Sequence, residues 1–489
     1  MTLRQARSGL LAASLAVALA ATLITGCSKP LEGGGQAKSS LYNPDTVGGL
    51  PVATGPSGVR PDAPEPEGDV VNGDDSEADT LGMLSVNDVV EFWEQHYIDP
   101  MAGSFEPVEN IASYDSTNPL GPRLCGSDWF RKPNAFFCPG ADMIAWDRGS
   151  LVPTGIKYFG DVSIAALLAH EYGHAVQTMG DLVDRSTPVI VREQQADCFA
   201  GNYIRWVAEG NSKRFELNTS DGLNRVLAAV ITIRDPVLTP EDEEMVHEGH
   251  GNALDRISTF QVGFIDGVQA CAEIDLAQIK ASRGDMPMVL EDEHDQNGEA
   301  PINEKMVQMV TEVVSGIYGL DPSPTVTLDA NAPACPDVKA TPPVSYCPST
   351  NTIAVDLPGL QALGSQAGSK ERVLVQGDNT AISVLISRVA LALQQQRGVN
   401  LTDPAASVRT ACLTGVAQRK MVEPIDAPSG GNIVMTAGDF DEAVAGLLNN
   451  GLASSGVDGN TVAAGFTRIM AFRSGVINPS VDGCFTRFP

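Results

Sequence analysis

The sequence predicts an α+β protein built from two tandem copies of one domain, each a small antiparallel sheet followed by helices. Short strand-like runs, such as Ala135 to Cys138 and Asp142 to Asp147, precede long helical patterns. The cysteines of the first half recur in register in the second, at offsets between 209 and 217 residues along all the matched positions. An acidic, polar stretch from Glu291 to Glu299 lies between the copies and is typical of a linker.

Length and charge narrow the possible functions. The chain has 489 residues, which is enough for two or three domains with separate cores. Its 61 acidic residues exceed its 32 basic residues and give a net charge of −29. Such a charge argues against nucleic acid as a partner, because a binding surface for phosphates is basic.

The first residues have the pattern of an export signal. Two arginines precede an apolar run from Gly9 to Leu23, and Ile24-Thr25-Gly26-Cys27 follows. This pattern resembles a bacterial lipoprotein signal, which predicts removal of residues 1–26 and a lipid on Cys27. A plain secretory signal or a short membrane anchor is the alternative. We therefore expect an exported protein, lipid-anchored to the outer face of the bacterial cytoplasmic membrane or cell envelope.

Composition divides the remaining chain. Residues 27–83 are rich in glycine, proline and acidic residues and predict a flexible spacer. Ordered structure is expected from Leu84. The first domain is then 84–290, the linker 291–299 and the second domain 300–489.

The segment from Gly160 to Gly180 contains an H-E-x-x-H motif, His170-Glu171-Tyr172-Gly173-His174. In a helix, His170 and His174 project from the same face, which is the geometry two imidazoles need to bind one zinc ion. Glu171 is then placed to accept a proton from a water at the metal. The alternative is an ordinary amphipathic helix that carries two histidines.

A catalytic zinc site needs a third protein ligand, and a second predicted helix offers one. Glu193 and Asp197 are four residues apart, so both carboxylates can face the first helix. We assign Glu193 to the metal and Asp197 to a hydrogen bond with a ligand histidine. Two solvated carboxylates on a helix face are the alternative.

The second half lacks these residues. When Gly160-Asp161 is aligned with Gly377-Asp378, the motif residues fall on Ser387, Arg388 and Leu391. The two carboxylates fall on Ser407 and Ala411. We therefore expect one zinc ion per chain and a second copy that has lost its metal site.

The segments HEYGHAVQ and EQQADCFAG resemble a family of bacterial neutral zinc metallopeptidases, within the glutamate-liganded zincins. The resemblance covers roughly residues 84 to 285 and implies a zincin-like fold with His170, His174 and Glu193 as ligands and Glu171 as general base. It also implies a later His-Gly before a helix with an arginine, matched by His250-Gly251 and Arg256. Members often carry another histidine after the motif, where this chain has Ala175.

These residues together predict a zinc metallopeptidase that hydrolyses peptide bonds of proteins or peptides in the cell envelope. His250 is a candidate donor to the developing oxyanion, and a structural histidine before the next helix is an equal alternative. An envelope scaffold or binding module built on the same fold is the alternative function.

Eight cysteines remain after Cys27, and an even number in an exported chain predicts disulfides. If both halves inherited one pairing, each bridge lies within a half, which leaves three connectivities per half. The pairs we favour are Cys125–Cys138, Cys198–Cys271, Cys335–Cys347 and Cys412–Cys484.

Overall fold

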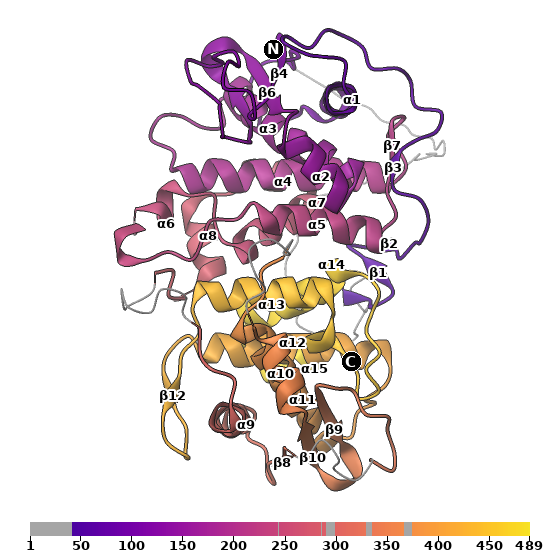
Figure 1. Ribbon diagram of the computed structural model, residues 1–489. Helices are drawn as coiled ribbons and strands as arrows, with labels where there is room; N and C mark the ends of the chain where they lie inside the picture. Colours follow the sequence, from indigo (N-terminus) through magenta and orange to yellow (C-terminus); the bar gives the residue numbers. More distant parts are fainter. Residues whose placement is uncertain (1–41, 243, 285, 290–298, 329–334, 366–373) are drawn as a thin grey trace, which may run out of the picture. The chain divides into compact units, whose positions relative to one another are not determined.

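The computed structural model describes residues 42–242, 244–284, 286–289, 299–328, 335–365 and 374–489 (Figure 1). The protein is mixed α/β, about 51% helical, with small sheets. Within the described residues, no helix is both long enough and apolar enough to cross a membrane. The expected signal segment 1–26, the expected lipid site Cys27 and residues 291–298 of the expected linker lie outside the described residues.

Residues 42–76 differ from the flexible spacer expected there. Val47 is completely buried, and the backbone N–H of Ala53 donates to the Thr219 hydroxyl at 2.8 Å. Backbone hydrogen bonds and a few apolar side chains, among them Val47, Leu50 and Val52, hold this stretch against the core, although its overall composition predicts a spacer. Three two-residue strands form here: β1 (Thr46–Val47), β2 (Leu50–Pro51) and β3 (Gly58–Val59), of which β3 pairs with β7 (Phe215–Glu216).

The first helix, α1 (Glu77–His96), begins before Leu84, the expected start of order. Ser76 caps it by accepting a hydrogen bond from the backbone N–H of Asp79. The capping residue therefore lies in the polar segment that was predicted to be a spacer.

The first sheet consists of β4 (Asn110–Tyr114), β5 (Ala135–Cys138) and β6 (Met143–Asp147). Strand β6 is central and pairs antiparallel with β5 and parallel with β4. The sheet is therefore mixed, whereas the sequence predicted an antiparallel one. The prediction missed β4 because this short segment carries no clear strand pattern. Strand β5 lies at the edge, beside helix α3.

The first half continues with helices, and two of them carry the predicted site. Helix α3 packs against α4, and a Cβ at Gly173 of α3 would lie 3.1 Å from the Ala196 backbone of α4. Small residues thus allow the two helices to approach closely. The helices are α2 (Leu151–Phe159), α3 (Asp161–Met179), α4 (Val189–Ala208), α5 (Asp221–Thr232), α6 (Met245–Glu248), α7 (Ala253–Ala272) and α8 (Leu276–Arg283).

Helices α4 and α7 make the closest contact in this half. A Cβ at Gly201 would overlap the carbonyl oxygen of Phe260, and one at Gly263 would overlap that of Cys198. The Cys198–Cys271 disulfide joins the same two helices. Glycine is required at both positions because each helix backbone rests directly on the other.

The second half, residues 300–489, contains a sheet with the same pairing as the first. Strand β10 is central, antiparallel to β9 and parallel to β8. Its main elements are α9 (Glu304–Tyr318), β8 (Thr325–Thr327), β9 (Val344–Cys347), β10 (Thr352–Val355), α10 (Leu357–Leu363), α11 (Asp378–Gln396), α12 (Pro404–Lys420), β11 (Ile425–Asp426), β12 (Asn432–Ile433), α13 (Ala437–Asn449), α14 (Gly465–Ile477) and α15 (Val481–Arg487).

The helix contacts of the second half also match those of the first. A Cβ at Gly415 of α12 would overlap the Phe472 carbonyl, and one at Gly475 of α14 would overlap the Cys412 carbonyl. Four disulfides are formed, and they are the pairs favoured from the sequence: Cys125–Cys138, Cys198–Cys271, Cys335–Cys347 and Cys412–Cys484.

We predict that Gly201→Ala lowers the free energy of unfolding by about 3 kcal/mol, because the added methyl group forces α4 away from α7. Gly316→Ala is the matched control, since Gly316 also lies within a helix but has open space around it. The control should raise the free energy of unfolding by less than about 1 kcal/mol, because alanine is a better helix former than glycine. Denaturant unfolding measures both variants, and equal effects would contradict the close contact.

Candidate metal centre

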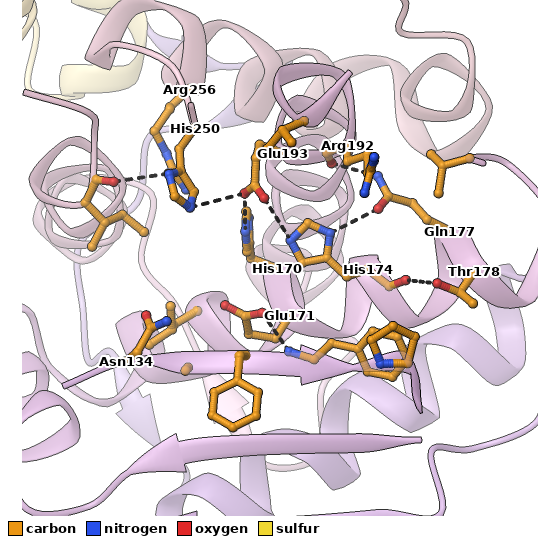
Figure 2. Close-up of a pocket in the computed structure, with 18 of the residues that line it drawn as sticks. Asn134, His170, Glu171, His174, Gln177, Thr178, Arg192, Glu193, His250 and Arg256 are labelled. Atoms are coloured by element: carbon orange, nitrogen blue, oxygen red, sulfur yellow. Dashed lines mark hydrogen bonds and ion pairs between the residues drawn. The ribbon is translucent and has the colours of Figure 1, made fainter. Parts of the chain in front are cut away.

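Helices α3 and α4 bring His170, His174 and Glu193 together, as the sequence predicts (Figure 2). The Nε2 atom of His170 lies 3.2 Å from Glu193 Oε2, and that of His174 lies 3.5 Å from Glu193 Oε1. Their ligand atoms all lie within 4.8 Å of one another. This group could therefore hold a metal ion.

The other ring nitrogen of each histidine has an acceptor of its own. His170 Nδ1 lies 2.8 Å from Asp197 Oδ1, and His174 Nδ1 lies 3.0 Å from Gln177 Oε1. An Nδ1–H that donates to these oxygens leaves the Nε2 lone pair of each neutral ring facing Glu193. The contact of Asp197 with His170 is the one expected from the sequence.

The surroundings of the Glu193 carboxylate indicate whether a cation fits between these residues. Its Oε2 atom is buried and has no hydrogen-bond partner among the described residues. Two imidazole lone pairs and a carboxylate that face one another repel unless a proton or a metal ion lies between them. The residues present therefore fit a bound cation with two nitrogen ligands and one oxygen ligand.

The electrostatic field of the site also favours positive charge. Burial opposes protonation of His170, but the Asp197 and Glu193 carboxylates outweigh it and raise the pKa of His170 to about 10. Burial acts to raise the pKa of Glu193, yet the two histidines hold that pKa well below its usual range. Both shifts arise from the close pairing of imidazole and carboxylate groups, which favours the charged form of each partner.

Glu171 lies beside the metal-binding group but is not part of it. Its carboxylate accepts a hydrogen bond from the backbone N–H of Phe137, on the edge strand β5, at 3.1 Å. Burial raises the pKa of Glu171, and the two histidines oppose that rise. A buried carboxylate that faces the cleft and holds no ligand position suits proton transfer.

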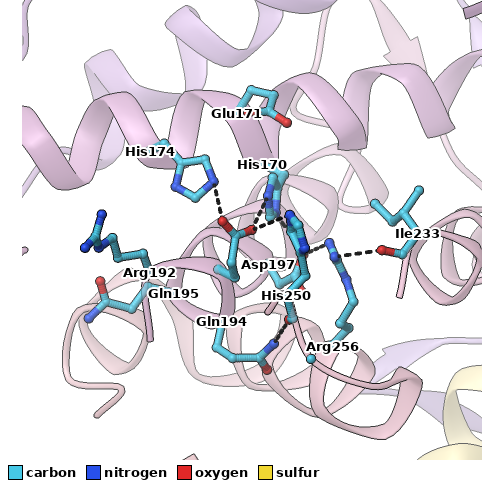
Figure 3. A network of polar contacts seen from close by, with 12 residues as sticks. His170, Glu171, His174, Arg192, Gln194, Gln195, Asp197, Ile233, His250 and Arg256 are labelled. Atoms are coloured by element: carbon cyan, nitrogen blue, oxygen red, sulfur yellow. Dashed lines mark hydrogen bonds and ion pairs between the residues drawn. The ribbon is translucent and has the colours of Figure 1, made fainter. Parts of the chain in front are cut away.

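His250 lies on the other side of the His170, His174 and Glu193 group from Glu171 (Figure 3). Its Nδ1 lies 3.3 Å from Asp235 Oδ1, and its Nε2 lies 3.9 Å from Glu193 Oε2. The ring is 55% exposed, and the hydrogen bond to Asp235 raises its pKa. The structure thus places His250 where it can donate a hydrogen bond toward the cleft.

Two site residues were not predicted from the sequence. Gln177 follows His174 by three residues, a spacing that places both on one helix face and could have identified it. Asp235 follows helix α5 and contacts both His250 and the backbone N–H of Gly251, at 2.7 Å for the latter. No motif marks Asp235, because it lies outside a helix and its contacts with His250 and Gly251 follow no regular spacing.

Arg256 completes the network under the site. Its Nη2 donates to Asp197 Oδ1 at 2.7 Å, so this one oxygen serves both Arg256 and His170. Arg256 is 1% exposed, and its other contact is the carbonyl of Ile233. The arginine predicted after the His-Gly pair therefore fixes the carboxylate that orients a histidine.

The group lies in a cleft of about 470 Å³, bounded on one side by residues 134–137 and on another by Ile233 and His250. A second cavity of about 140 Å³ opens beside His170, between α2, α3 and α5. It shares His170 and Arg256 with the cleft. The side chains around it are mostly apolar, among them Leu151, Phe159, Ile164, Leu167, Ala229, Val230 and Ile233.

The corresponding place in the second half is filled. Ser387, Arg388 and Leu391 are each fully buried on α11. The guanidinium of Arg388 donates to the Val344 carbonyl of β9 and to the Ser455 hydroxyl. These residues offer no imidazole or carboxylate ligand there.

Another group of carboxylates lies at the start of α11 and consists of Glu299, just before the second half, with Asp378 and Glu442. Their partners include backbone N–H groups, such as those of Asp378 and Asn379. Helix N-termini favour such acids without a metal ion.

Comparison of the chain with family models, with curated proteins and with solved structures gives no match.

Proposed function

We propose that this protein is a zinc-dependent peptidase, exported and anchored by a lipid on Cys27, that cleaves proteins or peptides of the cell envelope. The observation that carries the proposal is the largely buried set of His170, His174 and Glu193, in which Glu193 Oε2 accepts no hydrogen bond from the described residues and lies 3.2 Å from the Nε2 atom of His170. Two nitrogen ligands and one carboxylate are a set typical of catalytic zinc. The four disulfides fit an oxidising, exported environment.

In this proposal His170, His174 and Glu193 hold the zinc ion, and Asp197 orients His170. When bound, zinc supplies a Lewis acid that polarises a carbonyl and lowers the pKa of water. Glu171 accepts a proton from the attacking water and returns it to the leaving amine. The hydrogen bond from Phe137 keeps the Glu171 carboxylate turned toward the cleft. His250, held by Asp235, donates a hydrogen bond to the charge that develops on the carbonyl oxygen.

The walls of the cleft support an extended peptide as the substrate. Where β5 begins to pair with β6, the backbone N–H of Asp147 donates to the Asn134 carbonyl. The N–H of Phe137 points away from β6, toward the Glu171 carboxylate. The outer edge of β5 therefore faces the cleft, where a peptide can add as a further strand. Such pairing recognises the backbone and leaves side-chain preference to the neighbouring cavities.

The apolar cavity beside His170 supports a preference for one large apolar side chain. Its volume of about 140 Å³ matches that of apolar cavities of roughly 150 Å³, which stay dry and hold a benzene ring. A leucine or phenylalanine side chain of the substrate fits this space. A charged side chain would lose its hydration there without a partner.

The proposal includes an inactive second copy of the same zincin-like domain. Its support is the matched sheet pairing, the matched disulfides and the matched glycines at helix crossings. Where Glu171 accepts an N–H from β5, Arg388 donates to a carbonyl of β9. The second half keeps the framework and lacks the ligands.

We predict about one equivalent of zinc in the purified protein, because only one half holds the ligand set. His170→Ala and His174→Ala should each lose it, whereas His250→Ala, a change to a neighbouring histidine that is no ligand, should retain it. Metal analysis by mass spectrometry measures the content. Two tightly bound equivalents would refute the inactive second copy, and none would refute the peptidase.

We predict that Glu171→Gln retains zinc and lowers kcat for peptide hydrolysis by roughly 10²–10⁴-fold, since the carboxylate moves protons and binds no metal. Glu209→Gln, which changes an exposed carboxylate at the end of α4, is the control and should leave kcat unchanged. Loss of zinc from Glu171→Gln would show that Glu171 is a ligand. Full activity of that variant would exclude it as the base.

We predict that Ala229→Leu lowers kcat/KM for peptides with a leucine or phenylalanine at the preferred position by roughly 10–200-fold, because the new side chain fills the cavity. Peptides with alanine there should be affected little. Arg225→Leu adds the same side chain at an exposed site on the same helix and should change neither class. A library of peptides varied at each position around the cleaved bond gives the comparison.

A further inference from the structure

One acidic side chain of the second half reaches the segment that carries His250. Asp441, on α13, is 3% exposed. Its Oδ2 accepts a hydrogen bond from Arg234 Nε at 3.0 Å, and its Oδ1 accepts the backbone N–H of Ala253 at 2.7 Å. Arg234 and Ala253 are the two ends of a connection between α5 and α7. A single carboxylate therefore holds both ends of this connection.

Each end lies next to a residue of the candidate site. Arg234 precedes Asp235, and Ala253 follows His250 by three positions. Within the first half, the backbone N–H of Asp235 donates to the Gly251 carbonyl, and the Asp235 carboxylate accepts the Gly251 N–H. Asp441 thus fixes the spacing that lets Asp235 contact the His250 ring.

The His250 ring has few other restraints. It is 55% exposed, and its ring contacts are Asp235 and Glu193. Its carbonyl accepts a hydrogen bond from Gln194 at 2.8 Å, which holds the backbone and not the ring. The position of the ring consequently depends on where Asp235 lies, and Asp235 lies where Arg234 and Gly251 place it.

The N–H that Asp441 accepts is one that a helix leaves without an internal partner. Asn252 caps α7 by accepting from Asp255, which leaves the N–H of Ala253, the first helical residue, for another acceptor. In this protein the second half supplies that acceptor. Because the carboxylate is buried and paired with Arg234, the contact is strong and directional.

We propose that the second half takes part in the reaction through Asp441, a positioning residue that holds Asp235 and His250 beside the metal ligands. This inference rests on the proposed peptidase activity. In this role the second half, which has no copy of the candidate metal site, supplies a contact that the first half does not make by itself.

A double-mutant cycle on the full chain tests the proposal, with Asp441→Ala, His250→Ala and the two combined. Asp441→Ala should lower kcat for a peptide substrate by roughly 10–100-fold, as expected when a catalytic group is misplaced, with KM nearly constant. In the His250→Ala background, the same change should have no further effect, because the group it positions is gone. Asp441→Asn keeps an oxygen for Ala253 and should recover much of the rate.

Asn224→Ala is the control for contacts between the halves. It removes the hydrogen bond that Asn224 accepts from the Gly465 N–H at 2.8 Å, away from His250. This variant should keep the kcat of the unchanged protein. Equal losses of rate for Asp441→Ala with and without His250 would overturn the proposal, since a general loss of structure acts in both backgrounds.

Amide hydrogen exchange at Gly251 gives a readout that needs no activity. Its N–H donates to Asp235 and not to Asp441, so faster exchange in Asp441→Ala reports loss of the Asp235 position. Asn224→Ala should leave this exchange unchanged. Unchanged exchange in Asp441→Ala would overturn the positioning role. If the unchanged protein cleaved no peptide, the proposed function would fail, and the exchange at Gly251 would still decide whether Asp441 orders the segment.

Discussion

The candidate site depends on the carboxylate of Asp197. One of its oxygens accepts hydrogen bonds from His170 on α3 and from Arg256 on α7, while Asp197 itself lies on α4. All three side chains are buried, so each charge needs the others. Loss of one partner from such a buried network typically costs about 3–5 kcal/mol. The glycine contacts between α4 and α7 bring the helices close enough for this one oxygen to reach both partners.

Spacing in the sequence predicts those site residues that lie on single helices. His170 and His174, like Glu193 and Asp197, are four residues apart, and one helix turn places each pair on one face. Asp235 and Asp441 could not be found this way, since neither shares a helix with the residues it contacts. Strand β4 was not predicted for a similar reason, because it is a strand through its pairing with β6 and not through a pattern of its own residues. The docked stretch around Val47 escaped prediction because a few buried apolar side chains and backbone hydrogen bonds hold it, and composition averaged over 57 residues does not reveal them.

Glu171 of the first half and Arg388 of the second, which align in the sequence, carry opposite charges, and each contacts a strand of its own half. Glu171 presents an acceptor to a strand N–H, and its carboxylate stays at the edge of an open cleft. Arg388 presents donors to a strand carbonyl and to Ser455, and the long side chain fills its surroundings completely. Burial lowers the pKa of Arg388 to about 10. The ligand set itself is also missing there, because Ser387, Leu391 and Ser407 stand at the positions aligned with His170, His174 and Glu193.

The contact between Ala253 and Asp441 spans 188 positions of the chain. Contacts of such long range form late in folding, after the local helices and the nearer pairs. The segment that carries His250 thus receives its last partner only when most of the second half has emerged and folded. For the proposed peptidase, this order of events delays the complete site until the chain around it is compact.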